Sequence, residues 1–143
     1  IDGCWSPKET IATISNAMDV SKPNNWPRVE FMLQDGIVAK DCVSAQSIDE
    51  EQTQMAVQGL YKLGYTSEPH AGVAYKALKY SLEDGEFGVF LGTAHPAKFK
   101  ETVESILGQP MGLPKELADC AGEPILSKDM SYDYSELRAY LLA

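Results

Sequence analysis

One stretch, residues 87–101, limits the folds open to this chain more than any other part of the sequence. Residues 87–91 (Phe-Gly-Val-Phe-Leu) form a nearly continuous apolar run, which is typical of a strand buried on both faces inside a parallel sheet. The run stops at Gly92, and Pro96 is well placed to begin a helix that has one apolar face and ends at Gly108. A strand that leads directly into a helix predicts an α/β fold.

The connection between this strand and this helix is the candidate ligand site. Thr93, Ala94 and His95 follow the carboxyl end of the strand and lie close to a helix N-terminus, where open α/β sheets usually bind ligands. The alternative is an ordinary connection, in which Thr93 caps the helix and His95 is a solvated polar side chain. The local pattern leaves both interpretations open.

The remaining helices are predicted from apolar periodicity and from capping residues. A capping box of Ser47 and Glu50 should begin a helix that places Ala56, Val57, Leu60 and Leu63 inward and stops at Gly64. The strongest helical pattern begins at His70, and its small apolar residues near the start indicate close packing against another element. The predicted helices cover residues 25–36, 47–63, 70–82, 96–107 and 115–118, and a last helix is capped by Asp133 and Glu136.

Strands are few in this sequence. Apart from residues 87–91, only residues 10–14 and 37–45 have a β-favouring composition. A parallel sheet needs more strands than these, so we expect most of the sheet to lie outside this chain. The chain also begins at Ile1 rather than at Met, and its first residues read as the middle of a longer protein.

Composition excludes several classes of function. The formal net charge is −9, from 12 Lys and Arg against 21 Asp and Glu, and no basic run or zinc-finger spacing occurs, so nucleic acid is not an expected partner. No apolar run is long enough to span a bilayer and the N-terminus lacks the layout of a signal peptide, so we expect a cytoplasmic protein without a membrane partner.

The metal-binding and thiol residues do not form a site. Cys4, Cys42 and Cys120 are far apart and form no Cys-x-x-Cys unit, which indicates free thiols in a reducing compartment. The two histidines are 25 positions apart on different predicted elements, so no metal site is predicted.

Three blocks of the sequence resemble the C-terminal part of threonine synthases. The first is Gly-Thr-Ala-His-Pro-Ala-Lys-Phe at residues 92–99, with Leu-Pro-Lys-Glu-Leu at residues 113–117 after the next helix. The others are Ser-Asn-Ala-Met-Asp-Val at residues 15–20, which leads to Pro-Asn-Asn-Trp-Pro-Arg at residues 23–28, and Gly-Tyr-Thr-Ser-Glu-Pro-His at residues 64–70. The blocks come in the order of that family and together span nearly the whole chain.

One of these blocks departs from a common version of its motif. Many relatives read Asp-Pro-His-Thr-Ala at the third block, so Glu68, Ala71 and Gly72 differ from that version.

The resemblance implies the helix-rich C-terminal part of a pyridoxal phosphate enzyme of fold type II. Such enzymes convert O-phosphohomoserine and water to threonine and phosphate by elimination and addition. In this family a hydroxyl residue near the C-terminus meets the pyridine nitrogen, and Thr93 holds that motif position. Unlike a carboxylate, a hydroxyl can hydrogen-bond this nitrogen without forcing it to be protonated.

Other parts that the family needs are absent from this sequence. The Schiff-base lysine belongs to a Ser-Phe-Lys-Asp type of motif, and neither this motif nor the Gly-rich loop that holds the cofactor phosphate occurs here. We therefore expect no catalytic residue in this chain, both features upstream, and no activity from the chain alone. Its expected partners are the rest of a threonine synthase chain and the substrate.

Four further residues are candidate substrate ligands. His70 could lie near the substrate, or it could be a structural hydrogen-bonding group at a helix start. His95 and Lys98 flank a helix end where a positive group could bind a phosphate or carboxylate, although Lys98 could equally be a surface residue. Arg28 shares with Asp19 and Asn25 a block that resembles the family's segment beside the active site, and an ion pair that fixes this segment is the alternative role.

The resemblance also predicts how the chain is organised. Residues 1–46 form a loop, strand and helix segment beside the active site, residues 47–108 a helix-helix-strand-helix unit, and residues 109–143 a C-terminal wrap with the last helix. The alternative function is a free-standing, non-catalytic module that binds a small anion or a protein. A module should cover its sheet edges and apolar faces, whereas a segment of a larger enzyme should expose them.

Overall fold

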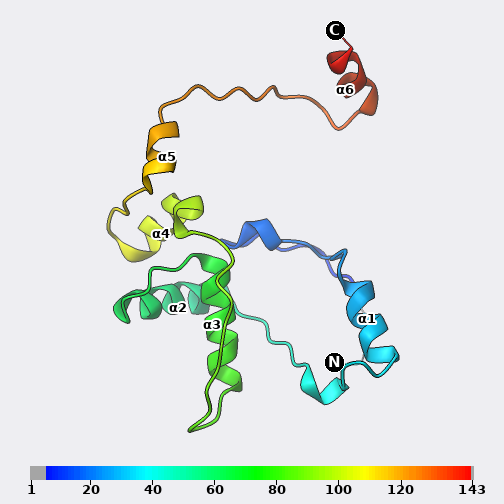
Figure 1. Ribbon diagram of the computed structural model, residues 1–143, viewed down its shortest axis with the longest axis vertical. Coiled ribbons are helices and arrows are strands. Elements are labelled where there is room, and N and C mark those ends of the chain that lie inside the picture. Colours follow the sequence, from blue (N-terminus) through cyan, green and yellow to red (C-terminus); the bar gives the residue numbers. More distant parts are fainter. Residues whose placement is uncertain (1–5, 143) are drawn as a thin grey trace. The chain divides into compact units, whose positions relative to one another are not determined.

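The computed structural model describes residues 6–142, and all regular structure in that range is helical (Figure 1). The chain divides into two compact units, Ile1–Gly112 and Leu113–Ala143. The α-helices are α1 (Trp26–Gln34), α2 (Glu50–Lys62), α3 (Pro69–Ser81), α4 (Lys100–Leu107), α5 (Lys115–Cys120) and α6 (Tyr134–Leu141), and the 3₁₀ turns are η1 (Asn16–Met18), η2 (Lys40–Cys42) and η3 (Pro96–Phe99). None of the helices in residues 6–142 is long and apolar enough to cross a bilayer.

The N-terminus of α2 uses a different cap from the one predicted. Asp49, not Ser47, is the N-cap: its carboxylate accepts from the backbone N–H of Gln52 at 2.8 Å, while the Gln52 side chain accepts from the Asp49 N–H at 3.1 Å. The Ser47 prediction was wrong because a carboxylate with a Gln three residues later satisfies two orphan donors, just before the first helical residue. Glu50 is then free to accept from the backbone N–H of Ile14, at 3.2 Å.

The core lies where α2 packs against α3 and α4. Ala56, Val57 and Leu60 of α2 are buried as predicted, but Leu63 is 74% exposed because α2 ends just before it and the chain turns at Gly64, with φ of 87°. Val103 of α4 is fully buried in the same unit.

The small residues at the start of α3 allow this packing. A methyl group at Gly72 would lie 2.8 Å from Cγ2 of Val57 and 3.3 Å from the backbone oxygen of Thr53, so the two helices approach as closely as predicted.

The other helices lie near their predicted positions. Asn25 is the N-cap residue of α1, Pro27 lies in its first turn, and Leu33 is its buried residue. The helix predicted from Pro96 begins as η3 and continues as α4, which ends at Gly108 with φ of 68°. Asp133 caps α6 through the backbone N–H of Ser135 at 2.9 Å.

The predicted strands do not form. Between residues 6 and 142 no strand is present; residues 87–91 are irregular, residues 40–42 of the second predicted strand form η2, and residues 10–14 are irregular or part of a turn. A strand is held by backbone hydrogen bonds to a neighbouring strand, and the described part of the chain offers no such neighbour. The chain is therefore helix-rich, and the α/β class is not seen in it.

Two of the three cysteines lie within the described residues, and both are free thiols as predicted. Cys42 and Cys120 are free and exposed. Cys4 lies outside the described residues.

Candidate functional site

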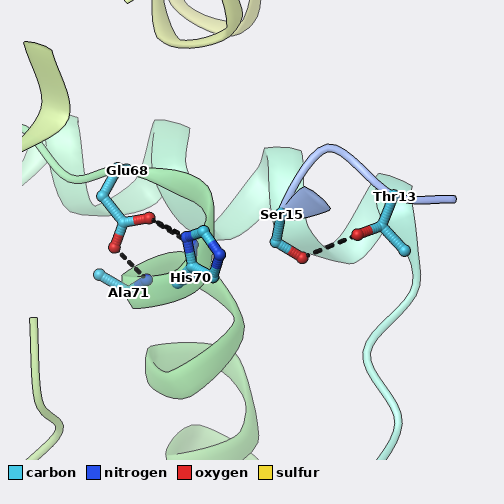
Figure 2. Close-up of polar contacts among 5 residues, drawn as sticks. All are labelled: Thr13, Ser15, Glu68, His70 and Ala71. Carbon is cyan, nitrogen blue, oxygen red and sulfur yellow. Dashed lines mark hydrogen bonds and ion pairs between the residues drawn. The ribbon is translucent and has the colours of Figure 1, made fainter. Parts of the chain in front are cut away.

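The turn that begins α3 is built around a buried carboxylate. Glu68 is fully buried, and its carboxylate accepts from the backbone N–H groups of His70 and Ala71, both at 2.8 Å (Figure 2). With Pro69 as the first helical residue, these bonds satisfy the donors that a helix start leaves unpaired. Glu68 was not predicted as the cap, although an acidic residue directly before a Pro is typical of a helix start.

The same carboxylate orients His70. Nδ1 of His70 lies 2.5 Å from Oε2 of Glu68, and the ring packs on Phe99 with centroids 5.1 Å apart. Its other nitrogen, Nε2, is buried and has no hydrogen-bond partner among the described residues; the hydroxyl of Ser67 is in the same state. The contact of Nδ1 with Glu68 fits a structural role for His70 at the helix start. The unpartnered Nε2 leaves a role near the substrate open.

In the connection after residue 91, His95 rather than Thr93 caps the helix that follows. Nδ1 of His95 accepts from the backbone N–H of Ala97 at 3.1 Å, so His95 is the N-cap of η3. The alternative in which Thr93 caps this helix is therefore wrong, because the imidazole already fills the cap position. Thr93 is exposed, and its hydroxyl has no hydrogen bond to any residue that the structure describes.

Two of the three sequence blocks meet at an open hollow beside this connection. The hollow has a volume of about 410 Å³ and is lined by Tyr65, Thr66, Ala94, His95, Pro96, Met111 and Gly112. A methyl group at Gly92 would lie 2.8 Å from the hydroxyl of Tyr65, so the backbone runs close against the start of α3 here.

The block at residues 15–28 reaches the same region only in part. Asn16 lines a second hollow of about 490 Å³ with residues 97–102, including Lys98, which is exposed. Arg28 is not brought there: its guanidinium donates to the side chain of Asn25 on the same helix start, so a local hydrogen bond takes the place of the ion pair considered above. Asp19 accepts from the backbone N–H and the hydroxyl of Thr13, at 2.8 and 2.6 Å, and closes its own turn.

A charged pair lies next to the two hollows, since Lys100 lines the second hollow and Met111 lines the first. The carboxylate of Glu104 lies 2.7 Å from the Lys100 ammonium and accepts from the backbone N–H of Met111 at 2.7 Å. The hydrogen bond from Lys100, followed by the bond from Met111, holds the pKa of the Glu104 carboxyl below its ordinary value. No group of three or more His, Cys, Asp or Glu side chains in residues 6–142 is arranged to hold a metal ion.

Comparison with known proteins finds similar sequences. Residues 71–141 match the family model described as "Threonine synthase, C-terminal". Threonine synthase of Escherichia coli (strain K12) is 55% identical over 141 residues, which is 99% of this chain and 33% of that protein. Over almost its whole length the chain is therefore similar to the C-terminal part of threonine synthases. It spans about a third of the length of the threonine synthases it matches.

Other threonine synthases show the same similarity. That of Serratia marcescens is 51% identical over 98% of this chain and 33% of that protein. The crystal structure of the Escherichia coli threonine synthase superposes with a TM-score of 0.87, covering 99% of this chain and 33% of that one. A structure of PLP-bound threonine synthase from Brucella melitensis, 21% identical, superposes with a TM-score of 0.71 over 98% of this chain and 36% of that one, which shows a shared fold.

Proposed function

We propose that this chain is the C-terminal third of a threonine synthase that converts O-phosphohomoserine and water to threonine and phosphate with pyridoxal phosphate. The observation that carries the proposal is the 55% identity to a threonine synthase over 99% of this chain. The architecture of the whole enzyme would then be fold type II, with the rest of the threonine synthase chain as the partner and the cytoplasm as the location.

The residues present fit the cofactor at one point. Thr93 offers an exposed hydroxyl without a partner in the described part of the chain, since His95 takes the capping role. A hydroxyl can hydrogen-bond a pyridine nitrogen in either protonation state, so Thr93 would hold the ring without fixing its charge. Pyridoxal phosphate, when bound, supplies an electron sink for carbanion chemistry.

Four residues are proposed to contact the substrate, each with a different group to offer. Lys98, exposed beside Asn16, offers a positive charge for a phosphate or carboxylate. His95 lines the neighbouring hollow while it caps η3, and His70 keeps Nε2 available near Phe99. Arg28 stays a candidate only as a second positive group, because its guanidinium is bonded to Asn25.

The free-standing binding module is the second candidate, and exposed apolar side chains argue against it. Phe87, Ile125 and Leu126 are 91%, 88% and 92% exposed. A self-contained domain would normally cover such groups, whereas a segment of a larger enzyme leaves them for its partner.

A chimaera tests the proposal. This chain would replace the matched third of the Escherichia coli enzyme, and phosphate release from O-phosphohomoserine would be measured. We expect activity, a loss of about tenfold or more in kcat/KM for Thr93→Val, and near-normal activity for Thr93→Ser, which keeps the hydroxyl. Equal activity of the Val and Ser variants would contradict the role of Thr93.

The chain alone provides the complementary measurement. Incubation with pyridoxal phosphate and borohydride, followed by mass mapping, should give no lysine adduct at a single site. Stoichiometric labelling of one lysine, such as Lys98 or Lys100, would show that this chain binds the cofactor covalently by itself and would contradict an upstream lysine.

A further inference from the structure

The loop after α4 forms one wall of the first hollow, the one of about 410 Å³ that His95 lines. Residues 109–112 contain no helix or strand, and Met111 and Gly112 line this hollow together with His95. Gly108, with φ of 68°, ends α4 and turns the chain, so that Met111 returns to within hydrogen-bond distance of Glu104 on that helix. The shape of the hollow therefore depends on how a loop without regular structure is held.

A single carboxylate oxygen holds this loop to α4. Oε1 of Glu104 accepts from the backbone N–H of Met111 at 2.7 Å, across seven positions of the sequence. Within residues 6–142, this is the one hydrogen bond that the backbone of residues 109–112 makes. The same oxygen lies 2.7 Å from the ammonium of Lys100, which lines the second hollow. One side chain thus borders both hollows and fixes the wall of the first.

The helix that carries Glu104 is a firm support. Val103, the preceding residue, is fully buried in the core, and the side chain of Gln58 in α2 donates to the backbone oxygen of Ile106 at 2.9 Å. The Glu104 side chain is itself 24% exposed, so its surroundings restrict the rotamers open to it. A carboxylate on an anchored helix transmits that anchoring to the loop it binds.

The alternative role for Glu104 is that of an ordinary ion-pair residue on a helix surface. Lys100 and Glu104 are four positions apart, and partly exposed pairs with this spacing contribute little to stability. Lys115 and Asp119 form a pair with the same spacing on α5. In the part of the chain that the structure describes, Asp119 accepts no hydrogen bond from a loop N–H. The bond to Met111 is therefore what distinguishes Glu104 from Asp119.

We propose that Glu104 is a positioning residue for the substrate site, which holds Met111 and Gly112 so that the first hollow has its binding shape before O-phosphohomoserine arrives. The proposal rests on the proposed function, because it takes the hollow beside His95 as part of the substrate site. A loop that is ordered only part of the time lowers the apparent affinity, since only the ordered fraction binds. Glu104 acts through the Met111 N–H and touches no reacting atom, so its loss should appear in KM rather than in kcat.

Steady-state kinetics of the Escherichia coli chimaera test this role. Glu104→Ala removes both contacts, whereas Glu104→Gln keeps a side-chain oxygen that can accept from the Met111 N–H. We expect Glu104→Ala to raise the KM for O-phosphohomoserine by about tenfold and to change kcat by less than about threefold. Glu104→Gln should stay within about threefold of the native KM. A variant that only destabilises the fold would lower kcat through loss of folded enzyme, and an unchanged KM in Glu104→Ala would overturn the proposal.

Asp119→Ala is the matched control. It removes a carboxylate from an ion pair of the same spacing, but it frees no loop N–H. Its KM should therefore lie within about twofold of the native value. An equal rise of KM in Asp119→Ala and Glu104→Ala would assign the effect to lost negative charge and would also overturn the proposal.

Amide hydrogen exchange measures the contact independently of catalysis. Exchange at residues 109–112 would be followed by mass spectrometry in this chain, with and without Glu104→Ala. We expect exchange in this loop to become faster by about tenfold or more in the variant, while residues 103–106 of α4 keep their protection. Unchanged exchange in the loop would show that Glu104 does not hold it and would overturn the proposal.

The chimaera also separates this inference from the function on which it rests. A chimaera with Glu104 intact that releases no phosphate would contradict the proposed function, and the positioning role with it. An active chimaera whose KM does not respond to Glu104→Ala would contradict the positioning role alone.

Discussion

Glu68 connects local capping to the candidate site at the scale of single residues. Its carboxylate is fully buried and makes three contacts within one turn, to the N–H of His70, the N–H of Ala71 and Nδ1 of His70. Burial of a carboxylate is unfavourable unless such partners replace water. The residue therefore fixes both the start of α3 and the orientation of the imidazole.

Replacing Glu68 should be costly. Glu68→Ala removes the cap and leaves buried N–H groups unpaired, so we expect the free energy of unfolding to fall by about 1–3 kcal/mol in a urea titration. Asp133→Ala is the matched control, because it removes an exposed cap from α6 in the other unit. An equal fall in the free energy of unfolding in the two variants would argue against a special role for burial at Glu68.

Glu104 gives the chain a pH-dependent contact. Its pKa is lowered by the Lys100 hydrogen bond and then by the Met111 N–H, so the folded state binds this proton less readily than the unfolded state does. The resulting stability is present above the ordinary pKa of 4.5 and is lost as the pH falls through the lower folded value. In urea titrations from pH 6 to pH 3, the stability difference between the native chain and Glu104→Gln should shrink with acidity. A difference that does not change with pH would contradict this assignment.

At the scale of elements, the contact between α2 and α3 depends on Gly72. A Cβ there meets the fully buried Val57 side chain and a backbone oxygen, neither of which can move freely. The close approach brings the start of α3, and with it His70, against the body of this unit.

Two glycine substitutions should act in opposite directions. Gly72→Ala should lower the free energy of unfolding by about 1–2 kcal/mol, because overpacking exceeds the gain in helix propensity. Gly59→Ala, inside α2 with nothing within 4 Å of the added carbon, should raise it by about 0.5–1 kcal/mol. Thermal or urea unfolding of both variants checks the pair, and a stabilising Gly72→Ala would show that the helices can separate at little cost.

On the scale of the whole molecule, the buried core lies within one unit. The buried apolar side chains of the described residues fall between Leu33 and Val103, all inside Ile1–Gly112. α4 contributes Val103 to that core, and Gln58 of α2 donates to the backbone oxygen of Ile106 at 2.9 Å.

Truncated chains test whether the buried core depends only on residues up to Gly112. A chain that stops after Gly112 should melt within about 4 °C of the full chain, which corresponds to a stability change below about 1 kcal/mol. A chain that stops after Thr93 loses α4 with Val103 and should lose the cooperative melt. A large drop in melting temperature for the longer truncation would show that residues after 112 stabilise the core.

Much of this protein could be read from the sequence because the signals are local. The periodic pattern of α2 and α3, Gly64 and Gly108 as stops, and Asp133 as a cap each depend on residues within a few positions of one another. The family blocks at residues 15–28, 64–70 and 92–99 were also visible, since motif identity needs no coordinates.

Contacts between distant residues were decided only by the tertiary structure. Which residue caps η3 depended on where the His95 ring lies, and Thr93 keeps a hydroxyl without a hydrogen bond to any residue within 6–142. The packing of His70 on Phe99 joins two blocks almost thirty residues apart in sequence. Residues 87–91 have the composition of a strand but no ladder, because strand formation needs a partner that lies at a distance along the chain or outside it. Local composition sets the preference of a segment, and the neighbours available in space determine whether that preference is realised.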